Sequence, residues 1–426
     1  MSSQTPGVTS DASESAALQR VGASQPPTGP RNYGGLASVA DYRRAARRRL
    51  PKAIFDFVDG GAGHERTLRA NERAFQRYAF RPRVLTDVAG VDLGVTVLGQ
   101  RCELPLFLGP SGVQRLVSKE GEVDAARAAA KAKTIYVLTV AASRSIEEVA
   151  DAAPSGRRWF QLYLWRDHDW AEKLIERARQ ADYEALCVTV DIKSPGGPRY
   201  RDIRNGVDRM PDSIGIKTVW DSARHLRWLS GFVRGGPIRN PHIMEDGKAG
   251  TFFNAPKAIR TRMDPSADWE EVRWLRRAWD GPLIVKGILT AEDAEEAYDC
   301  GADAVVCSNH GGRALDGGPA SLHVLPRIVE VAKRHRKEVY FDGGIRTGGD
   351  AVKAMALGAD ACLIARPFWW GMAVKGEAGV LDVLRILSDE MISSLVLMGR
   401  PILDHVDLDC IEDLWQSGVG CDVQPG

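Results

Sequence analysis

From about residue 104 onward, short apolar runs alternate with helix-like stretches, and this repeat limits the fold more than any other feature. The runs are apolar throughout rather than at every second position, which is typical of strands buried on both faces of a parallel sheet. Eight such units close a (β/α)8 barrel, so we predict an α/β fold with a single TIM barrel. The eight runs are LPLFLGP (104–110), TIYVLTV (134–140), WFQLYL (159–164), ALCVTVD (185–191), PLIVKG (282–287), DAVVCSN (303–309), VYFDGG (339–344) and ACLIARP (361–367).

An open, doubly wound sheet is the alternative. It usually carries G-x-G-x-x-G after its first strand, and the sequence has no such motif there. Two of the helix-like stretches also begin with an N-capping arrangement, in which Ser145 precedes Glu148 and Thr290 precedes Asp293 by three residues. These features favour the barrel.

Residues 205–264 break the repeat, and we predict a long insertion after the fourth strand. A basic amphipathic helix in this insertion would suit a membrane surface. Packing across the barrel or at a subunit interface is the alternative. The helix is predicted within IKTVWDSARHLRWLSGFVRGG, from the spacing of Val219, Leu226, Leu229 and Val233, with Trp220, Trp228 and several arginines.

The ends of the chain and its composition narrow the protein class. Residues 1–32 are rich in Ser, Thr, Pro, Gly and Ala and are predicted to be a disordered tail, with the barrel over 33–415 and a C-terminal tail over 416–426. A net charge of +1 gives no reason to expect nucleic acid. Seven scattered cysteines without a C-x-x-C pair indicate a reducing, cytoplasmic environment and no metal site.

Polar side chains collect where the predicted strands end, the edge that carries the chemistry in barrel enzymes. A hydroxyl, an amide, a lysine, a histidine and an arginine converging on one face are hard to ascribe to chance. These strand-end residues are Ser111, Thr139, Gln161, Tyr163, Thr189, Asp191, Lys286, Ser308, His310, Asp342 and Arg366.

Two strand ends indicate a phosphate site. DGGIRTGGD (342–350) places paired glycines before a helix start, so backbone N–H groups can face an anion, and Arg346 and Arg366 add charged donors. FMN and a sugar phosphate both fit this pattern. The alternative is that the glycines form turns and the arginines form surface ion pairs.

Lys286 and His310 carry the chemical hypotheses. A buried lysine can stabilise a reduced flavin or form a Schiff base. His310 with Asp191 makes a general-base pair, in which the carboxylate orients the ring. Arg313, three residues after His310, suits a carboxylate substrate.

Taken together, these motifs resemble the FMN-dependent 2-hydroxy acid oxidases and dehydrogenases, which include glycolate oxidase, lactate oxidase, lactate dehydrogenase and mandelate dehydrogenase. The likeness extends from about residue 38 to 400. It is carried by RRRLPKAIFDFVDGGAG, FRPRVL, FQLYL, VTVD, IVKGI, SNHGGR, DGGIRTGGD and ALGAD.

The resemblance implies a role for each matching residue. His310 would be the base, Asp191 its partner, and Tyr163 a contact of the substrate hydroxyl or keto oxygen. Arg199 and Arg313, with help from Tyr42, would bind the substrate carboxylate. The FMN-binding set would be Pro110, Ser111, Gly112, Thr139, Gln161, Thr189, Lys286, Ser308, Asp342, Gly343, Gly344, Ile345, Arg346, Ala365 and Arg366.

Four positions depart from the family pattern. Ala314 follows the arginine where glutamine is usual, and Ala365 replaces a glycine at the phosphate site. Ala141 stands where glycolate oxidase has a bulky tryptophan, which implies a roomier pocket. Gly112 replaces an alanine typical of many oxidases, so the resemblance leaves oxygen use open.

The expected function is oxidation of an L-2-hydroxy acid to the 2-oxo acid, with electrons passed from FMN to a quinone or oxygen. A bulkier substrate, such as a peptide-derived precursor, is one alternative, and a flavin-binding protein without turnover is another. We also expect a homo-oligomer, with a tetramer as one option. A location in the cytoplasm, with peripheral contact at the inner face of the membrane, completes the expectation.

Overall fold

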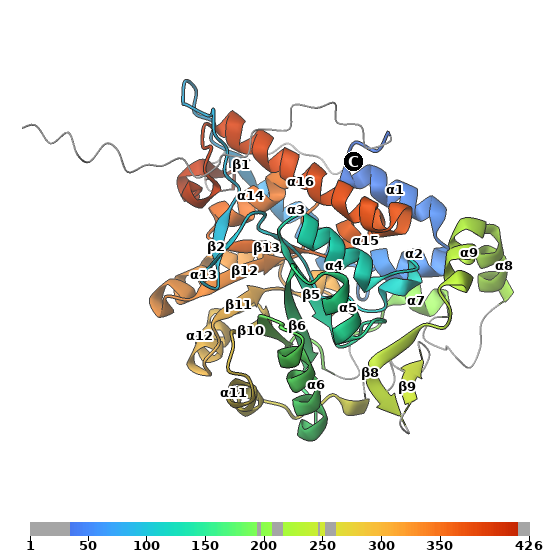
Figure 1. The fold of residues 1–426 in the computed structure, drawn as a ribbon. Helices are drawn as coiled ribbons and strands as arrows, with labels where there is room; N and C mark the ends of the chain where they lie inside the picture. The colour runs from blue at the N-terminus through green and yellow to red at the C-terminus, as the bar shows by residue number, and fades with distance from the viewer. Residues whose placement is uncertain (1–34, 194–196, 207–215, 246–247, 252–260, 416–426) are drawn as a thin grey trace, which may run out of the picture.

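Eight parallel strands close into a barrel at the centre of the computed structural model (Figure 1). The structure describes residues 35–193, 197–206, 216–245, 248–251 and 261–415. Neighbours around the barrel follow chain order, and the last strand pairs with the first. The predicted barrel is confirmed. Its strands are β4 (Leu106–Leu108), β5 (Ile135–Thr139), β6 (Arg157–Tyr163), β7 (Ala185–Thr189), β10 (Leu283–Ile288), β11 (Ala304–Cys307), β12 (Glu338–Asp342) and β13 (Ala361–Ile364).

Aromatic side chains from alternate strands fill the barrel. Phe107 of β4 lies edge-on to Trp159 of β6, with ring centroids 5.2 Å apart, and to Tyr340 of β12 at 5.6 Å. All three side chains are fully buried. In barrels of this kind each interior layer comes from every second strand, so the interior is a packed core and the chemistry lies at the strand ends.

Helices surround the barrel and continue the strand–helix repeat. The side chains of Ser145 and Thr290 accept hydrogen bonds from the third residue of their helices, which confirms both predicted N-caps. The helices are α4 (Glu122–Lys131), α5 (Ile146–Ala152), α6 (His168–Gln180), α11 (Trp269–Ala278), α12 (Ala291–Asp299), α13 (Ser321–His335), α14 (Gly348–Ala356), α15 (Arg366–Lys375) and α16 (Glu377–Met398).

Three N-terminal helices precede the barrel and reach its functional edge. They are α1 (Val39–Arg49), α2 (Lys52–Asp59) and α3 (Arg66–Ala74). Helix α1 packs on α15, and α3 packs on the short 3-10 turn at 310–312 that follows β11. Strand β1 (Tyr78–Phe80) then pairs with β14 (Ile411–Asp413), and β2 (Val95–Val97) with β3 (Gln100–Cys102). The first helices of the chain therefore pack against elements that lie more than 200 residues later in the sequence.

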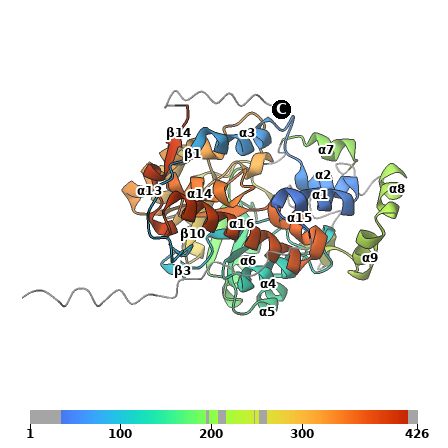
Figure 2. The ribbon, with the colours of Figure 1, turned by 90° about the horizontal axis from the view of Figure 1, so that it is seen from above.

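The predicted insertion lies between β7 and β10. Helix α7 (Tyr200–Arg204) precedes the predicted bounds of 205–264, within which lie α8 (Ile216–Arg224), α9 (Leu226–Arg234), β8 (Arg239–Glu245) and β9 (Lys248–Thr251). The single amphipathic helix predicted here is in fact two helices, because the backbone leaves the helical region at His225 (φ −95°, ψ 61°). Both helices stand at the edge of the molecule beside α1, α2 and α7 (Figures 1 and 2). In the described residues, no helix is both long and apolar enough to cross a membrane.

The tails predicted at 1–32 and 416–426 lie outside the described residues.

Candidate active site at the strand ends

A chain of hydrogen bonds joins the ends of three neighbouring strands. Gln161 of β6 accepts from the Thr139 hydroxyl of β5 and donates 3.0 Å to the Thr189 hydroxyl of β7. All three side chains are buried. Because the amide is fixed at both ends, its position is set by the barrel itself. The structure brings these three predicted cofactor residues together.

Lys286 of β10 continues this row as a buried cation. Its Nζ donates 2.8 Å to Ser308 Oγ and lies 3.0 Å from Asp342 Oδ2. Burial alone would lower the pKa of Lys286, but the carboxylates of Asp342 and Asp191 outweigh burial and raise it. The side chain is therefore a permanent positive charge, which argues against a neutral Schiff-base nucleophile.

His310 follows β11 and pairs with the end of β7. Its Nδ1 lies 2.9 Å from Asp191 Oδ1, and its backbone N–H donates 3.1 Å to Ser308 Oγ. Burial alone would raise the pKa of Asp191, but its interaction and hydrogen bond with His310 and the charge of Lys286 hold it below its usual value. Asp191 thus stays ionised and orients the ring, which leaves Nε2 to act on a substrate.

Tyr163, at the end of β6, is the third predicted catalytic residue. Burial raises the pKa of its hydroxyl to about 12, with a further contribution from Asp191 and opposing ones from Lys286 and Arg313. The hydroxyl is therefore neutral near pH 7 and can donate a hydrogen bond to an oxygen. Its electrostatic coupling to Asp191 and Arg313 places it within the same group.

The two predicted carboxylate-binding arginines meet over one aromatic ring. Arg199 Cζ lies 4.9 Å from the centroid of the Phe57 ring, and Arg313 Cζ lies 5.5 Å from it. Arg313 Nη1 also donates to the carbonyls of Phe57 (2.9 Å) and Gly60 (3.0 Å). Helix α2 and Gly60 after it therefore hold Arg313, whereas Arg199 contacts the Phe57 ring and forms an ion pair with Asp202 of α7 (Tyr200–Arg204).

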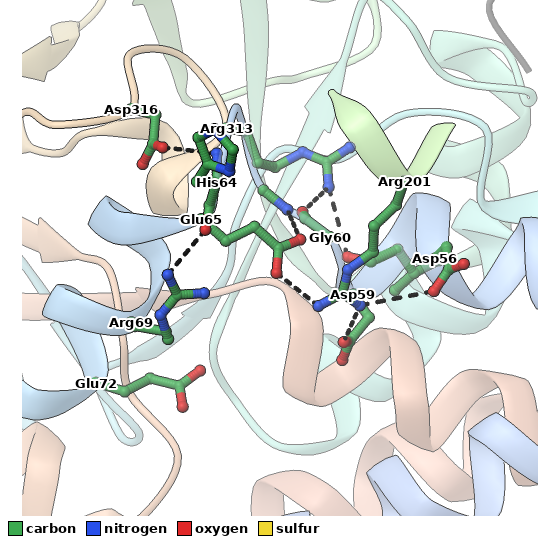
Figure 3. A network of polar contacts seen from close by, with 12 residues as sticks. Asp56, Asp59, Gly60, His64, Glu65, Arg69, Glu72, Arg201, Arg313 and Asp316 are labelled. Carbon is green, nitrogen blue, oxygen red and sulfur yellow. Dashed lines mark hydrogen bonds and ion pairs between the residues drawn. The ribbon is translucent and has the colours of Figure 1, made fainter. Parts of the chain in front are cut away.

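A polar network ties α2 to α7, the helix that Arg199 precedes (Figure 3). Arg201 Nη1 donates 2.9 Å to Asp59 Oδ2, and its Nη2 donates 2.7 Å to Glu65 Oε2. Asp59 is almost fully buried and also accepts 2.7 Å from Arg43 Nε. These ion pairs fix α7, and with it Arg199, against the end of α2.

Arg346 and Arg366, predicted to bind phosphate, already have protein partners. Arg366 donates to the carbonyls of Asp59 (3.1 Å), Gly60 (2.9 Å) and Gly311 (2.9 Å). Arg346 Nη2 donates 2.7 Å to a Glu72 carboxylate oxygen. A guanidinium has five N–H donors, so both can hold these partners and still donate to an anion.

The backbone N–H groups at the start of α14 were predicted to face an anion, but in the structure they bond protein carboxylates. The backbone N–H groups of Arg346 and Thr347 both donate to Asp350 Oδ2, at 3.0 and 2.9 Å. The Gly348 N–H donates 2.7 Å to Glu390. These carboxylates already satisfy the helix start, so an anion at this edge would have to bind to the glycine segment and the arginine side chains.

Gly343 and Gly344 precede this helix with φ angles of 114° and 91°. A Cβ at Gly344 would lie 2.3 Å from the carbonyl oxygen of Asn71 on α3. A Cβ at Gly112, after β4, would lie 2.7 Å from the Ala141 Cβ. Gly344 therefore allows the loop after β12 to approach α3 closely, and Gly112 allows the loops after β4 and β5 to approach each other. Pro110, Ser111, Ile345 and Ala365 occupy the same strand-end loops, after β4, β12 and β13.

The structure does not bring Tyr42 to this group. Tyr42 lies on α1, is 0% exposed, and its hydroxyl donates 2.6 Å to Asp382 on α16. The aromatic residue that meets the arginines is Phe57, one helix later. Phe57 lies inside a motif quoted for the resemblance, but an apolar residue in an apolar stretch gives no signal of its own.

Arg366, Arg313 and Arg199 concentrate positive charge at this edge and lie close enough for some of them to repel one another. The pKa of Arg366 is lowered to about 9, first by burial and then by the charges of Arg313 and Arg346. Burial likewise lowers the pKa of Arg313 to about 10. Arg199 is lowered as well, by burial and then by Arg313 and Arg366. A bound phosphate or carboxylate would relieve this repulsion.

These donors fit FMN. The buried Lys286 suits the electron-rich side of a flavin ring, and Thr139, Gln161 and Thr189 supply hydrogen-bonding groups beside it. Among the described residues, the buried Asp342 Oδ1 has no hydrogen-bond partner, so it can accept from a hydroxyl of a ribityl chain. The arginine charges suit the phosphate. The ring, chain and phosphate of FMN therefore each find suitable residues.

Comparison with known proteins agrees with this geometry. The sequence matches the family described as FMN-dependent dehydrogenase over residues 46–413. It is 40% identical to 2-hydroxyacid oxidase 1 of Homo sapiens, across 87% of this chain and 95% of that protein. It is also 40% identical to an L-lactate oxidase of Nostoc sp., across 87% and 96%.

Among solved structures, a monotopic membrane protein, (S)-mandelate dehydrogenase, superimposes with a TM-score of 0.84 at 36% identity, covering 89% of this chain and 100% of that one. The chain therefore belongs to the FMN-dependent dehydrogenase family of 2-hydroxy acid oxidases and dehydrogenases, and its cofactor is FMN.

Proposed function

We propose that the protein oxidises an L-2-hydroxy acid to the 2-oxo acid and that the electrons pass through FMN to a quinone or to oxygen. The observation that carries the proposal is the His310–Asp191 pair, 2.9 Å apart, beside the two arginines held over Phe57. A base and a carboxylate clamp are what an α-hydroxy carboxylate requires.

The reaction removes two electrons and two protons from the substrate. Bound FMN supplies the electron acceptor. His310 takes one proton at Nε2, because Nδ1 is engaged by Asp191. The ring serves either order of events. If the α-hydrogen leaves with its electrons, His310 takes the hydroxyl proton; otherwise His310 takes the α-proton, and the hydroxyl proton leaves to solvent or to the reduced cofactor as the electron pair is given up. In both cases Asp191 stabilises the imidazolium that forms.

Arg313 and Arg199 bind the substrate carboxylate and so aim the α-carbon at the base. Their partners on α2 and α7 hold the guanidinium groups before substrate arrives, which reduces the entropic cost of binding. Tyr163 is a neutral donor for the hydroxyl or keto oxygen. The carboxylate also offsets the repulsion between the two arginines.

The pocket favours a larger side chain than that of glycolate. Position 141 carries a methyl group only, and its Cβ packs against Gly112 rather than projecting as a bulky wall. Aromatic or branched 2-hydroxy acids are therefore the preferred candidates. A still bulkier, peptide-derived precursor is a second candidate that rests on the same residue.

The test is anaerobic bleaching of the flavin by a panel of small, branched and aromatic 2-hydroxy acids, followed by air or a soluble quinone. We expect aromatic or branched acids to bleach the flavin at least as fast as glycolate. Reoxidation by air or by quinone then identifies the acceptor. Purified protein whose flavin no 2-hydroxy acid bleaches would contradict the proposal.

A peripheral membrane contact would bring the site near a quinone. On α8 and α9 the side chains of Val219, Trp220, Leu226 and Val233 are 55–71% exposed. Exposed arginines lie among them at 224, 227 and 234. Apolar residues interleaved with arginine suit an anionic lipid surface. The similarity to (S)-mandelate dehydrogenase, a monotopic membrane protein, supports this proposal.

Co-sedimentation with phosphatidylglycerol vesicles tests this contact. The double variant Trp220→Asp, Leu226→Asp should lose vesicle binding and keep flavin reduction. Leu397→Asp is a matched control, because Leu397 is 73% exposed on α16, outside the α8–α9 hairpin. Equal binding by the double variant and the control would reject the membrane surface.

We further propose a homo-oligomer on the cytoplasmic side, where the six free, buried cysteines of the described residues would remain reduced. Sedimentation velocity of the purified protein tests the oligomer, and a monomer would reject it.

A further inference from the structure

Two buried asparagines form a reciprocal amide pair beside the catalytic histidine. Asn71 Nδ2 donates 2.8 Å to Asn309 Oδ1, and Asn309 Nδ2 donates 2.7 Å back to Asn71 Oδ1. Asn71 is 1% exposed on α3, and Asn309 is 4% exposed immediately before His310. A doubly bonded pair of buried amides permits only one mutual orientation, because a shift of either side chain would leave a buried donor and acceptor unpaired.

The pair holds a segment of unfavourable backbone. His310, Gly311 and Gly312 have φ angles of 57°, 61° and 73°. A histidine in the left-handed region is strained and persists only where its surroundings impose it. Asn309 imposes it here, since Oδ1 also accepts 3.0 Å from the Gly312 N–H and Nδ2 donates 2.9 Å to the Pro319 carbonyl. The amide therefore closes the turn that carries the base.

Asn71 contacts the phosphate side of the site as well. Its carbonyl oxygen would lie 2.3 Å from a Cβ at Gly344, and its Nδ2 would lie 3.3 Å from a Cβ at Gly343. Its Oδ1 accepts from the Ser321 N–H at 3.4 Å, and the Ser321 hydroxyl donates 2.6 Å to the Asp342 carbonyl. One side chain of α3 thus connects the histidine turn with the loop after β12.

We propose that Asn71 is a positioning residue: acting through Asn309, it fixes the 309–312 turn so that His310 Nε2 is aimed at the substrate. This inference rests on the proposed function, because it assigns His310 the role of base. The barrel fixes Asp191 at one side of the imidazole, and the amide pair fixes the backbone at the other. Together they leave the ring a single orientation.

The first test is anaerobic flavin reduction by Asn71→Ala, using the 2-hydroxy acid that reduces the wild type fastest. The limiting rate should fall roughly 10- to 100-fold, the scale of a displaced catalytic group. The substrate dissociation constant should change less than about threefold, because Arg313 and Arg199 are held by α2 and α7 and not by Asn71. A purely structural role would lower the melting temperature without this split between rate and binding.

Thr67→Val is the matched control. Thr67 is also buried on α3, and its hydroxyl bonds the same loop beyond His310, at the Leu315 and Gly318 carbonyls and the Gly317 N–H. We expect it to lose stability while keeping the limiting rate within about threefold of wild type. If Thr67→Val and Asn71→Ala slow the reaction equally, the amide pair has no specific role.

The double variant Asn71→Ala, Asn309→Ala checks that the two amides act as a unit. It should be no slower than Asn309→Ala alone, since either substitution already breaks the pair. Additive losses would overturn the proposal. If Asn71→Ala fails to fold, Asn71→Ser replaces it, because a single hydroxyl group cannot reproduce the two reciprocal bonds to Asn309. A rate within threefold of wild type in either folded variant would also overturn it.

Hydrogen exchange separates this inference from the proposed function. Asn71→Ala should speed amide exchange over residues 310–313, where the Gly312 N–H is bonded to Asn309, and Thr67→Val should not. This result does not depend on any substrate. Failure of wild-type flavin to bleach would therefore defeat the proposed function, whereas unchanged exchange in Asn71→Ala would defeat the positioning role.

Discussion

The two halves of the site are built in different ways. The side chains on the flavin side come directly from the ends of consecutive barrel strands, as the bonds from Thr139 to Gln161 to Thr189 illustrate. The carboxylate side depends on elements laid over the barrel from elsewhere. Arg313 is held by Gly60, which lies 253 residues earlier, and Arg201 by Asp59, 142 residues earlier.

This difference predicts what each half controls. Barrel strands are rigid and fully buried, so the groups at their ends keep their geometry whether or not substrate is present. The covering helices α2 and α7 are joined by ion pairs at the surface of the barrel, and in the proposed function they set the position of the carboxylate. We therefore expect substitutions on the strand side to alter the chemical step, and those on the covering side to alter substrate binding.

His310→Gln should have the largest effect. The base is lost while Asp191, Lys286 and the arginines remain, so FMN should stay bound and the rate of flavin reduction should fall by about 10³- to 10⁴-fold. Stopped-flow reduction under anaerobic conditions measures this rate. Near-normal flavin reduction would show that His310 is not the base, and the proposed difference between the two halves of the site would lose its main support.

Arg313→Lys should come next, with its main effect on binding. Lysine cannot reproduce a planar guanidinium that donates to the carbonyls of Phe57 and Gly60, at the end of α2, and still presents N–H groups to a carboxylate. We expect the substrate dissociation constant to rise roughly 10- to 100-fold, the scale of a lost charge-assisted bidentate pair. A large loss of limiting rate at saturating substrate, with binding intact, would place Arg313 on the chemical side instead.

The sequence predicts the strand side well because the barrel repeat fixes it. Once eight strands are recognised, the residue that follows each strand must lie at one edge, so Thr139, Gln161, Lys286 and His310 can be named without a structure. The two N-caps at Ser145 and Thr290 are equally local, since each needs only the following helical turn.

The covering side could not be predicted in this way. No periodicity shows that α2 returns to the loop after β11, and Tyr42 was named only from the family resemblance, which did not point to Phe57. The structure instead gives the Tyr42 hydroxyl to Asp382. Asn71 gave no signal either, because its function depends on Asn309, which lies 238 residues away.

Arg201→Met should have a smaller effect, again on binding. It removes the ion pairs to Asp59 and Glu65 that hold α7 against α2, so Arg199 loses its fixed position (Figure 3). We expect substrate binding to weaken by a few-fold to about tenfold, with the limiting rate unchanged. Arg69→Met is the matched control, because Arg69 belongs to the same network but donates only to the His64 carbonyl among the contacts drawn. Equal effects on substrate binding in the two variants would show that Arg201 does not position Arg199.

The smallest expected effect is on the stability of the fold and its pH dependence. It concerns Asp59, the carboxylate that joins α2 and α7. Burial alone would raise the pKa of Asp59, but its hydrogen bonds and ion pairs with Arg43 and Arg201 outweigh burial and lower it below the usual value. The unfolded chain therefore binds a proton more readily than the folded chain. The contribution of Asp59 is complete above the unfolded pKa of about 4 and is lost as the pH falls through the lower, folded pKa.

Asp59→Asn should consequently lower the free energy of unfolding at pH 7 by on the order of 2 kcal/mol, between the values for exposed and buried ion pairs. The difference from wild type should shrink as the pH is lowered below about 4, where the carboxylate becomes protonated in the unfolded wild-type chain while the folded chain still holds it ionised. Urea denaturation at pH 7, 4 and 3 measures it. Asp92→Asn is the control, because the Asp92–Arg101 pair is 42–46% exposed and should contribute less than about 1 kcal/mol. A deficit for Asp59→Asn that stays constant with pH would mean that Asp59 holds α2 and α7 by shape and hydrogen bonding rather than by charge.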